Sequence, residues 1–174
     1  VLHTMALAGT ARVEERDAFE ADEKEIREHE FVAQTLLAKL SDLGKAVHHS
    51  RDVMSLGPLV HYHSGIDVDL GKEEPINRLI SLLHPTPALG PLPRTKETLS
   101  DLISWRQRLG CPIWFGSPFG LFRDGYCEVL VAIRMIHWDG EKVSMPSGCG
   151  VIEESRLVNE WRELRLKRES VRSA

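Results

Sequence analysis

Several features that would restrict the function of this 174-residue sequence are scarce or absent. Its three cysteines are odd in number and far apart, with no CxxC spacing, so neither a disulfide framework nor a zinc site is indicated. No apolar run is long enough to cross a membrane, and the first residues lack the pattern of a signal peptide. We therefore expect a cytoplasmic protein with no membrane partner.

The sequence also has little positive charge to offer a polyanion. The formal net charge is −4, and no basic run precedes the extreme C-terminus. There, Arg165, Lys167, Arg168 and Arg172 alternate with glutamate and apolar residues, so nucleic acid is not expected as a partner. The composition, 42% apolar and 28% charged, is that of an ordinary globular chain, and the length fits one domain over residues 1–174.

The order of apolar patterns predicts an α+β fold, with helices packed on antiparallel sheet. Asp124-Gly125 and Asp139-Gly140 separate three apolar runs near the C-terminus, which predicts a three-stranded meander. Ser155 stands where a helix N-cap is expected. The predicted strands are 1–12, 58–70, 113–122, 126–138 and 142–152, and the predicted helices are 17–43, 75–83, 95–109 and 155–170.

Carboxylates recur at three-residue spacing on two of the predicted helices. Glu25 and Glu28 lie on one face of the first long helix, and Glu160 and Glu163 repeat the spacing on the last one. Oxygen ligands from two helices suit a hard cation such as Mg²⁺. The simpler interpretation is that these are solvated helix faces, with the acidic first turn favoured by the helix dipole.

Three further features allow two interpretations each. Arg134 is predicted to share an apolar strand face with Leu130, Ala132 and Ile136, so it needs an anionic partner, either a glutamate of the same protein or a ligand carboxylate. The Gly148-Cys149-Gly150 bend is either an anion-binding turn or simply a turn. His61 and His63 alternate on a predicted strand and therefore point the same way; either they form a metal pair, or a single one of them is hydrogen-bonded inside the core.

Six segments of the sequence carry a further signal together: Ala6–Arg12, Lys24–His29, Leu83–Gly90 with Pro93-Arg94, Ala132–Arg134, Gly148–Ile152 and Glu160–Glu163 with Lys167. In this order, they resemble the corresponding segments of chorismate-binding enzymes, and among these the isochorismate synthases. The loop between Leu83 and Gly90 is similar to the isochorismate synthase loop, and Ala8 stands where aminodeoxychorismate synthases carry a nucleophilic lysine.

The resemblance implies the C-terminal portion of the chorismate-binding, anthranilate synthase component I-like α/β sandwich. It implies that Glu28 and Glu163 ligate Mg²⁺, with Glu25 and Glu160 in support. It also implies that His61 is an active-site histidine, and that chorismate and isochorismate are the ligands. The implied substrate-binding residues are Thr10, Ala88, Phe115, Ile133, Arg134, Gly148, Gly150 and Lys167. A dianionic substrate suits a site with a cation, an arginine and a lysine.

The sequence also departs from the family pattern. The lysine that activates water and the glutamate that acts as general acid match positions before Val1, so we expect a C-terminal part that works with a separate N-terminal half or within a longer enzyme. Pro91, Cys149 and the stretch 108–112 also differ from the family. The alternatives are a non-catalytic or degenerate chorismate-binding module and, less favoured, an anthranilate-type synthase. The residues do not separate menaquinone, siderophore and salicylate biosynthesis.

Overall fold

The computed structural model describes residues 1–153 and 155–173, and the chain divides into two compact units, Val1–Ala88 and Leu89–Ala174. Helices and antiparallel strands occur in both units, so the predicted α+β class is confirmed. Across the described residues, no helix has the length and apolar character needed to cross a membrane.

The first unit is built around one long strand, β4 (Leu59–Leu70), which pairs antiparallel with three others. One edge of β4 carries β1 (Leu2–Arg12). The other edge is shared by two short strands, β3 (Asp52–Leu56) on its first half and β2 (Gly44–His48) on its second half. The predicted strands at 1–12 and 58–70 are confirmed, whereas β2 and β3 were not predicted.

The single helix predicted over 17–43 is wrong in its extent. After the 3-10 turn η1 (Val13–Glu15), the chain forms two separate helices, α1 (Arg16–Glu20) and α2 (Glu23–Leu40). Asp22 causes the restart. Its carboxylate accepts hydrogen bonds from the backbone N–H groups of Lys24 (2.9 Å) and Glu25 (3.3 Å), as an N-cap does. The second predicted helix, over 75–83, is confirmed as α3 (Ile76–Leu83), which ends before His84-Pro85.

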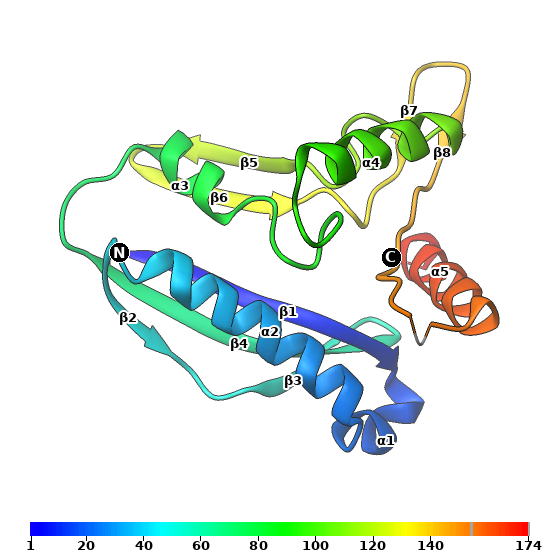
Figure 1. Cartoon of the computed structure of the whole chain (residues 1–174), viewed down its shortest axis with the longest axis horizontal. Coiled ribbons are helices and arrows are strands. Elements are labelled where there is room, and N and C mark those ends of the chain that lie inside the picture. The colour runs from blue at the N-terminus through cyan, green and yellow to red at the C-terminus, as the bar shows by residue number, and fades with distance from the viewer. Residues whose placement is uncertain (154, 174) are drawn as a thin grey trace. The chain divides into compact units, whose positions relative to one another are not determined.

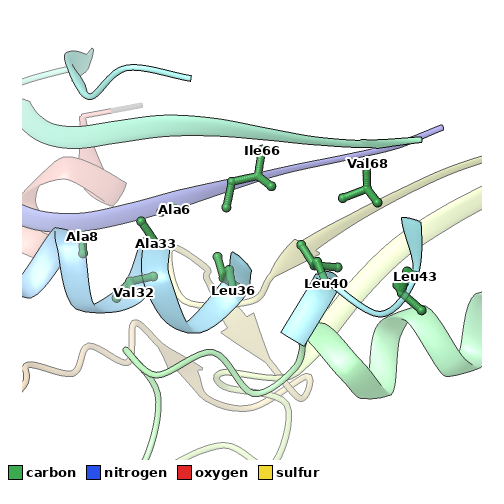
Figure 2. Close-up of a cluster of buried hydrophobic side chains, with 9 residues drawn as sticks. All are labelled: Ala6, Ala8, Val32, Ala33, Leu36, Leu40, Leu43, Ile66 and Val68. Atoms are coloured by element: carbon green, nitrogen blue, oxygen red, sulfur yellow. The ribbon is translucent and has the colours of Figure 1, made fainter. Parts of the chain in front are cut away.

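The core of this unit lies between α2 and the sheet. The buried face of α2 presents Val32, Ala33, Leu36 and Leu40, at the three- and four-residue spacing of one helical stripe. Figure 2 shows these side chains beside those that β1 and β4 contribute. The remaining members of the cluster are Ala6, Ala8, Leu43, Ile66 and Val68. Burial of this apolar surface fixes α2, and the acidic residues it carries, along the sheet (Figure 1).

The second unit begins with α4 (Lys96–Arg108), whose N-terminus is closed by a capping box between Thr95 and Thr98. It continues with β5 (Pro118–Arg123), β6 (Tyr126–Val131), β7 (His137–Trp138), β8 (Val143–Ser144) and α5 (Leu157–Arg172). Both Asp-Gly hairpins are confirmed. The first turn has positive φ at Asp124 (52°) and Gly125 (80°), as a type I′ turn requires.

Two details predicted for this unit are wrong. The three hairpin strands do not form one meander, because β5 pairs with β6 and β7 pairs with β8 in two separate sheets. Ser155 is not the N-cap of α5. Arg156 occupies that position without a side-chain cap, while the Ser155 hydroxyl accepts a hydrogen bond from the backbone N–H of Ile152.

Candidate functional site

In the first unit, a bulge in β1 lies beside His61. Between Ala8 and Ala11 the register of β1 slips by one residue against β4, because Ala8 pairs with Tyr62 and Ala11 with Val60. The extra residue redirects the carbonyl of Gly9 from the ladder to the His61 side chain, whose Nδ1 lies 2.8 Å from the Gly9 oxygen. The Thr10 hydroxyl lies 3.2 Å from the same nitrogen. The structure therefore brings together two predicted site residues, Thr10 and His61.

Glu25 joins this cluster from α2. Its Oε2 accepts a hydrogen bond from the backbone N–H of Thr10 at 3.2 Å, and its side chain is only 17% exposed. Gly9 has φ +74°, and a Cβ at this position would lie 3.0 Å from Glu25 Oε2 and 3.3 Å from the Phe19 ring. The bulge thus requires glycine, both for its backbone conformation and for the space around it.

The other predicted ligand on α2 faces elsewhere. Glu28 is exposed, whereas the next residue, His29, is fully buried. His29 Nε2 lies 3.2 Å from the Ser64 hydroxyl, which lies 3.0 Å from His48 Nε2. Burial lowers the pKa of His29, and nearby Glu30 partly offsets this. His29 was not among the residues predicted to be functional or buried, although its spacing to the core residues Val32 and Leu36 predicts a place on the buried face of the helix.

Arg134 is not on a strand, which corrects the prediction. β6 ends at Val131, and the carbonyl of Val131 accepts a hydrogen bond from the N–H of Ile133, which closes a tight turn. The chain therefore leaves the sheet before Arg134, and the apolar face predicted with Ala132 and Ile136 does not form. Partial burial lowers the pKa of Arg134, although the residue still reaches solvent, and the Glu163 carboxylate opposes this shift. The guanidinium remains charged at neutral pH.

Around Glu163, the helix α5 brings a second group of predicted residues together. The Lys167 ammonium pairs with Glu163 one turn away and donates a hydrogen bond to the carbonyl of Gly148 at 3.0 Å. The Lys167 side chain is 12% exposed. A Cβ on Gly148 would lie 3.5 Å from the Phe115 ring, so Phe115 packs closely against the Gly148–Gly150 bend. Lys167 and Glu163 thus form an ion pair beside this bend, and Glu163 also acts electrostatically on Arg134 within the second unit.

Glu160 completes this group and carries an unsatisfied oxygen. Its Oε2 is buried and makes no hydrogen bond within the described part of the chain. Burial, and then the neighbouring Glu160 carboxylate, raise the pKa of the Cys149 thiol to about 11, so this cysteine is a neutral thiol at pH 7. A buried carboxylate oxygen without a partner costs free energy unless a cation, a proton or water satisfies it.

The predicted residues are divided between the two units. Thr10, Glu25, Glu28, His61 and Ala88 belong to the first. Ala88 is exposed, in the loop after α3. The others belong to the second, where Ile133 is half-buried in the turn after β6 and Gly150 is exposed: Phe115, Ile133, Arg134, Gly148, Gly150, Glu160, Glu163 and Lys167. That carboxylates of both units share one cation stays a prediction.

The side-chain oxygens available as ligands decide whether Mg²⁺ fits this chain. Among residues 1–153 and 155–173, no three histidine, cysteine or acidic side chains gather closely enough to hold a metal ion. Within the second unit, however, Glu160 offers an unsatisfied buried oxygen, and Glu163 lies one turn further on α5. Carboxylate oxygens are the ligands that Mg²⁺ prefers, usually one or two of them with water and substrate oxygens. The donor chemistry of α5 therefore fits this ion.

Comparison with known proteins places this chain in a family. The family model for chorismate binding enzymes matches residues 1–174. The salicylate biosynthesis isochorismate synthase of Pseudomonas aeruginosa is 29% identical over 177 residues, covering 98% of this chain and 36% of that protein. The isochorismate synthase EntC of Escherichia coli is also 29% identical, covering 94% of this chain and 44% of that protein.

A solved structure supports the fold. The menaquinone-specific isochorismate synthase MenF of Escherichia coli matches with a TM-score of 0.78 at 24% identity, over 98% of this chain and 41% of that one. The chain thus spans less than half the length of each of these three proteins.

Proposed function

This chain belongs to the chorismate binding enzyme family, and from that premise we propose that it supplies the metal and substrate-carboxylate sites for the Mg²⁺-dependent conversion of chorismate to isochorismate. Its relatives in Pseudomonas aeruginosa and Escherichia coli are named as isochorismate synthases. Because the chain spans 36% and 44% of these relatives, we propose this role as part of a longer or two-part enzyme.

The observation that carries the proposal is the group of charges formed by Arg134, Glu163 and Lys167, with the Lys167 ammonium bound to the Gly148 carbonyl. Arg134 and Lys167 are cations, and each has Glu163 as a neighbouring carboxylate. A dianionic substrate would exchange these internal contacts for its own carboxylates, and charge-assisted hydrogen bonds to arginine and lysine are the strong ones. Glu160 and Glu163 would hold Mg²⁺ from α5, and the family resemblance implies that Glu28 and Glu25 of α2 would contribute as well. When bound, the ion would neutralise and orient a substrate carboxylate.

In the first unit, the proposed contribution is the bulge with His61. Thr10 would line the substrate pocket, and His61 would contact the ligand from β4. Ala88, Phe115 and Ile133 are proposed to supply apolar contacts. The water-activating lysine and the general-acid glutamate that the resemblance implies would come from the polypeptide that corresponds to the remaining length of the relatives.

Calorimetry with chorismate, with and without Mg²⁺, tests the metal and substrate sites. We expect binding that requires Mg²⁺ and weakens at least tenfold in Arg134→Leu, Glu160→Gln and Glu163→Gln. The matched control is Glu169→Gln, because Glu169 is an exposed carboxylate on the same helix. Equal affinities in control and site variants, or binding indifferent to Mg²⁺, would contradict the proposal.

Turnover distinguishes the enzyme from a non-catalytic binding module. We expect isochorismate to form only when the chain is joined with the remaining polypeptide of an isochorismate synthase. Mg²⁺-dependent binding without turnover in that assembled protein would favour the non-catalytic module instead.

The hairpin β5–β6 is the proposed contact surface for the polypeptide that corresponds to the remaining length of the relatives. Large apolar side chains on both of its strands are more than 60% exposed, namely Phe119, Leu121, Phe122, Tyr126 and Leu130. A monomer rarely leaves so many apolar side chains together in water. We expect the amides of β5 and β6 to exchange more slowly with deuterium when the polypeptide is added, while those of β4 stay unchanged. Unaltered exchange in β5 and β6 would exclude this surface.

A further inference from the structure

We infer that the bulge at Gly9, held in place by Glu25, is a positioning device that fixes the neutral His61 ring as the tautomer protonated on Nδ1. A carbonyl oxygen has lone pairs and no proton, so it only accepts hydrogen bonds. The 2.8 Å contact between the Gly9 oxygen and His61 Nδ1 is therefore made by an Nδ1–H group. In the neutral ring the proton is then on Nδ1, and Nε2 carries the lone pair.

The surroundings hold this arrangement from three sides. His61 is 6% exposed, so water does not compete for Nδ1. Glu25 Oε2 binds the N–H of Thr10, the residue after the redirected carbonyl, and so sets the orientation of the peptide unit between Gly9 and Thr10. The Phe19 ring, stacked on Tyr62 with centroids 4.3 Å apart, closes the space beside Gly9. The Gly9 oxygen is thus aimed before any ligand arrives.

The tautomer decides what His61 can do to a ligand. With the proton on Nδ1, the Nε2 of the neutral ring can act only as a hydrogen-bond acceptor. It therefore suits a hydroxyl group or a water molecule, and it does not suit a carboxylate, which needs a donor. This choice of ligand group rests on the proposed function, whereas the tautomer does not. Within the proposed site, Arg134 and Lys167 would then bind the ligand carboxylates, and His61 would contact a hydroxyl group or a water molecule.

Nitrogen NMR of the full chain tests the tautomer directly. The chain is labelled with ¹⁵N-histidine, and long-range proton–nitrogen correlations are recorded above the ordinary histidine pKa of about 6.5. His61→Gln assigns the signals among the eight histidines. We expect Nδ1 at the shift of a protonated nitrogen and Nε2 at that of an unprotonated one. The reverse pattern in the wild-type chain, or an average of the two forms, overturns the inference.

Two matched pairs of variants test the positioning role. Glu25→Gln keeps an acceptor oxygen for the Thr10 N–H and should retain the wild-type pattern, whereas Glu25→Ala should shift both signals toward the average. Thr10→Val removes the hydroxyl but keeps the backbone, so it should leave the pattern unchanged. A shift in Thr10→Val of the size seen in Glu25→Ala would assign the tautomer to the hydroxyl and overturn the role of the bulge. If both His61 nitrogen signals stay unchanged in Glu25→Ala, the positioning role of Glu25 is overturned.

Addition of chorismate and Mg²⁺ then tests the ligand group. We expect the Nε2 signal to move toward lower shift, as an acceptor does, while Nδ1 remains protonated. A ring protonated on both nitrogens in the complex would show a donor to a carboxylate and overturn this part. If calorimetry detects no binding at all, the proposed function fails, and the tautomer measured in the unliganded chain stands by itself.

Discussion

Replacement of Gly9 with alanine should destabilise the first unit far more than a comparable replacement in a turn. Gly9 has φ +74°, in the left-handed region, where an L-residue pays about 1–2 kcal/mol. The new Cβ would also lie 3.0 Å from Glu25 Oε2 and 3.3 Å from two atoms of the Phe19 ring. Phe19 is 4% exposed and stacked on Tyr62, so its ring cannot move aside, and overpacking of this kind costs about 1–3 kcal/mol.

The two contributions predict a loss of about 2–5 kcal/mol in the free energy of unfolding. Gly57→Ala is the matched control, because Gly57 has φ +59° but nothing within 4 Å of an added Cβ. It should cost only the backbone contribution, about 1–2 kcal/mol. Urea denaturation followed by circular dichroism measures both variants. If Gly9→Ala costs no more than Gly57→Ala, the bulge is not packed as described, and the argument for a fixed carbonyl fails.

Two further perturbations act near the same site. Tyr62→Phe removes a buried hydroxyl that donates to the Phe19 carbonyl at 2.7 Å, so we expect urea denaturation to show a loss of about 1–3 kcal/mol, and a loss near zero would contradict this bond. Burial lowers the pKa of His29 below its unfolded value, so the unfolded chain binds the proton more readily. Stability should therefore fall as pH drops below about 6.5, until the folded-state pKa is passed, and His29→Leu should flatten that part of the pH profile in urea titrations. An equally steep profile in the variant would assign the effect to other groups.

Local patterns in the sequence were enough for most helices and for the longest strands. α4 follows its capping residue Thr95, and the hairpins follow their Asp-Gly turns, because these signals act within a few residues. The short strands β2 and β3 were missed for two different reasons. β2 is five residues long and pairs with the second half of the twelve-residue β4, across the intervening β3, so its pairing is not visible in a local pattern. β3 is joined to β4 by the two residues Gly57-Pro58, with Gly57 at φ +59°, and this local turn signal was not used in the prediction.

The same limit explains the error at Arg134. The apolar alternation from Cys127 to Ile136 continues past the end of β6, but the hydrogen bond from Ile133 N–H to the Val131 carbonyl turns the backbone out of the sheet. This tight turn lies between apolar residues and contains no Gly, Pro or Asn, so the sequence gives no local signal for it. The i, i+4 pair Glu163–Lys167, by contrast, follows from helical spacing alone, and the structure contains that ion pair.

Glu25 illustrates how a residue predicted as a metal ligand acquires a second role. Its Oε2 already holds the Thr10 N–H, so one carboxylate oxygen serves the bulge whether or not a cation is present. Glu25→Gln separates the two roles, because it keeps an acceptor oxygen and removes the charge. Weaker Mg²⁺-dependent chorismate binding with an unchanged His61 tautomer would assign the charge to the metal site. Unchanged binding in Glu25→Gln, with a loss only in Glu25→Ala, would mean that Glu25 acts on the ligand solely through the orientation of His61.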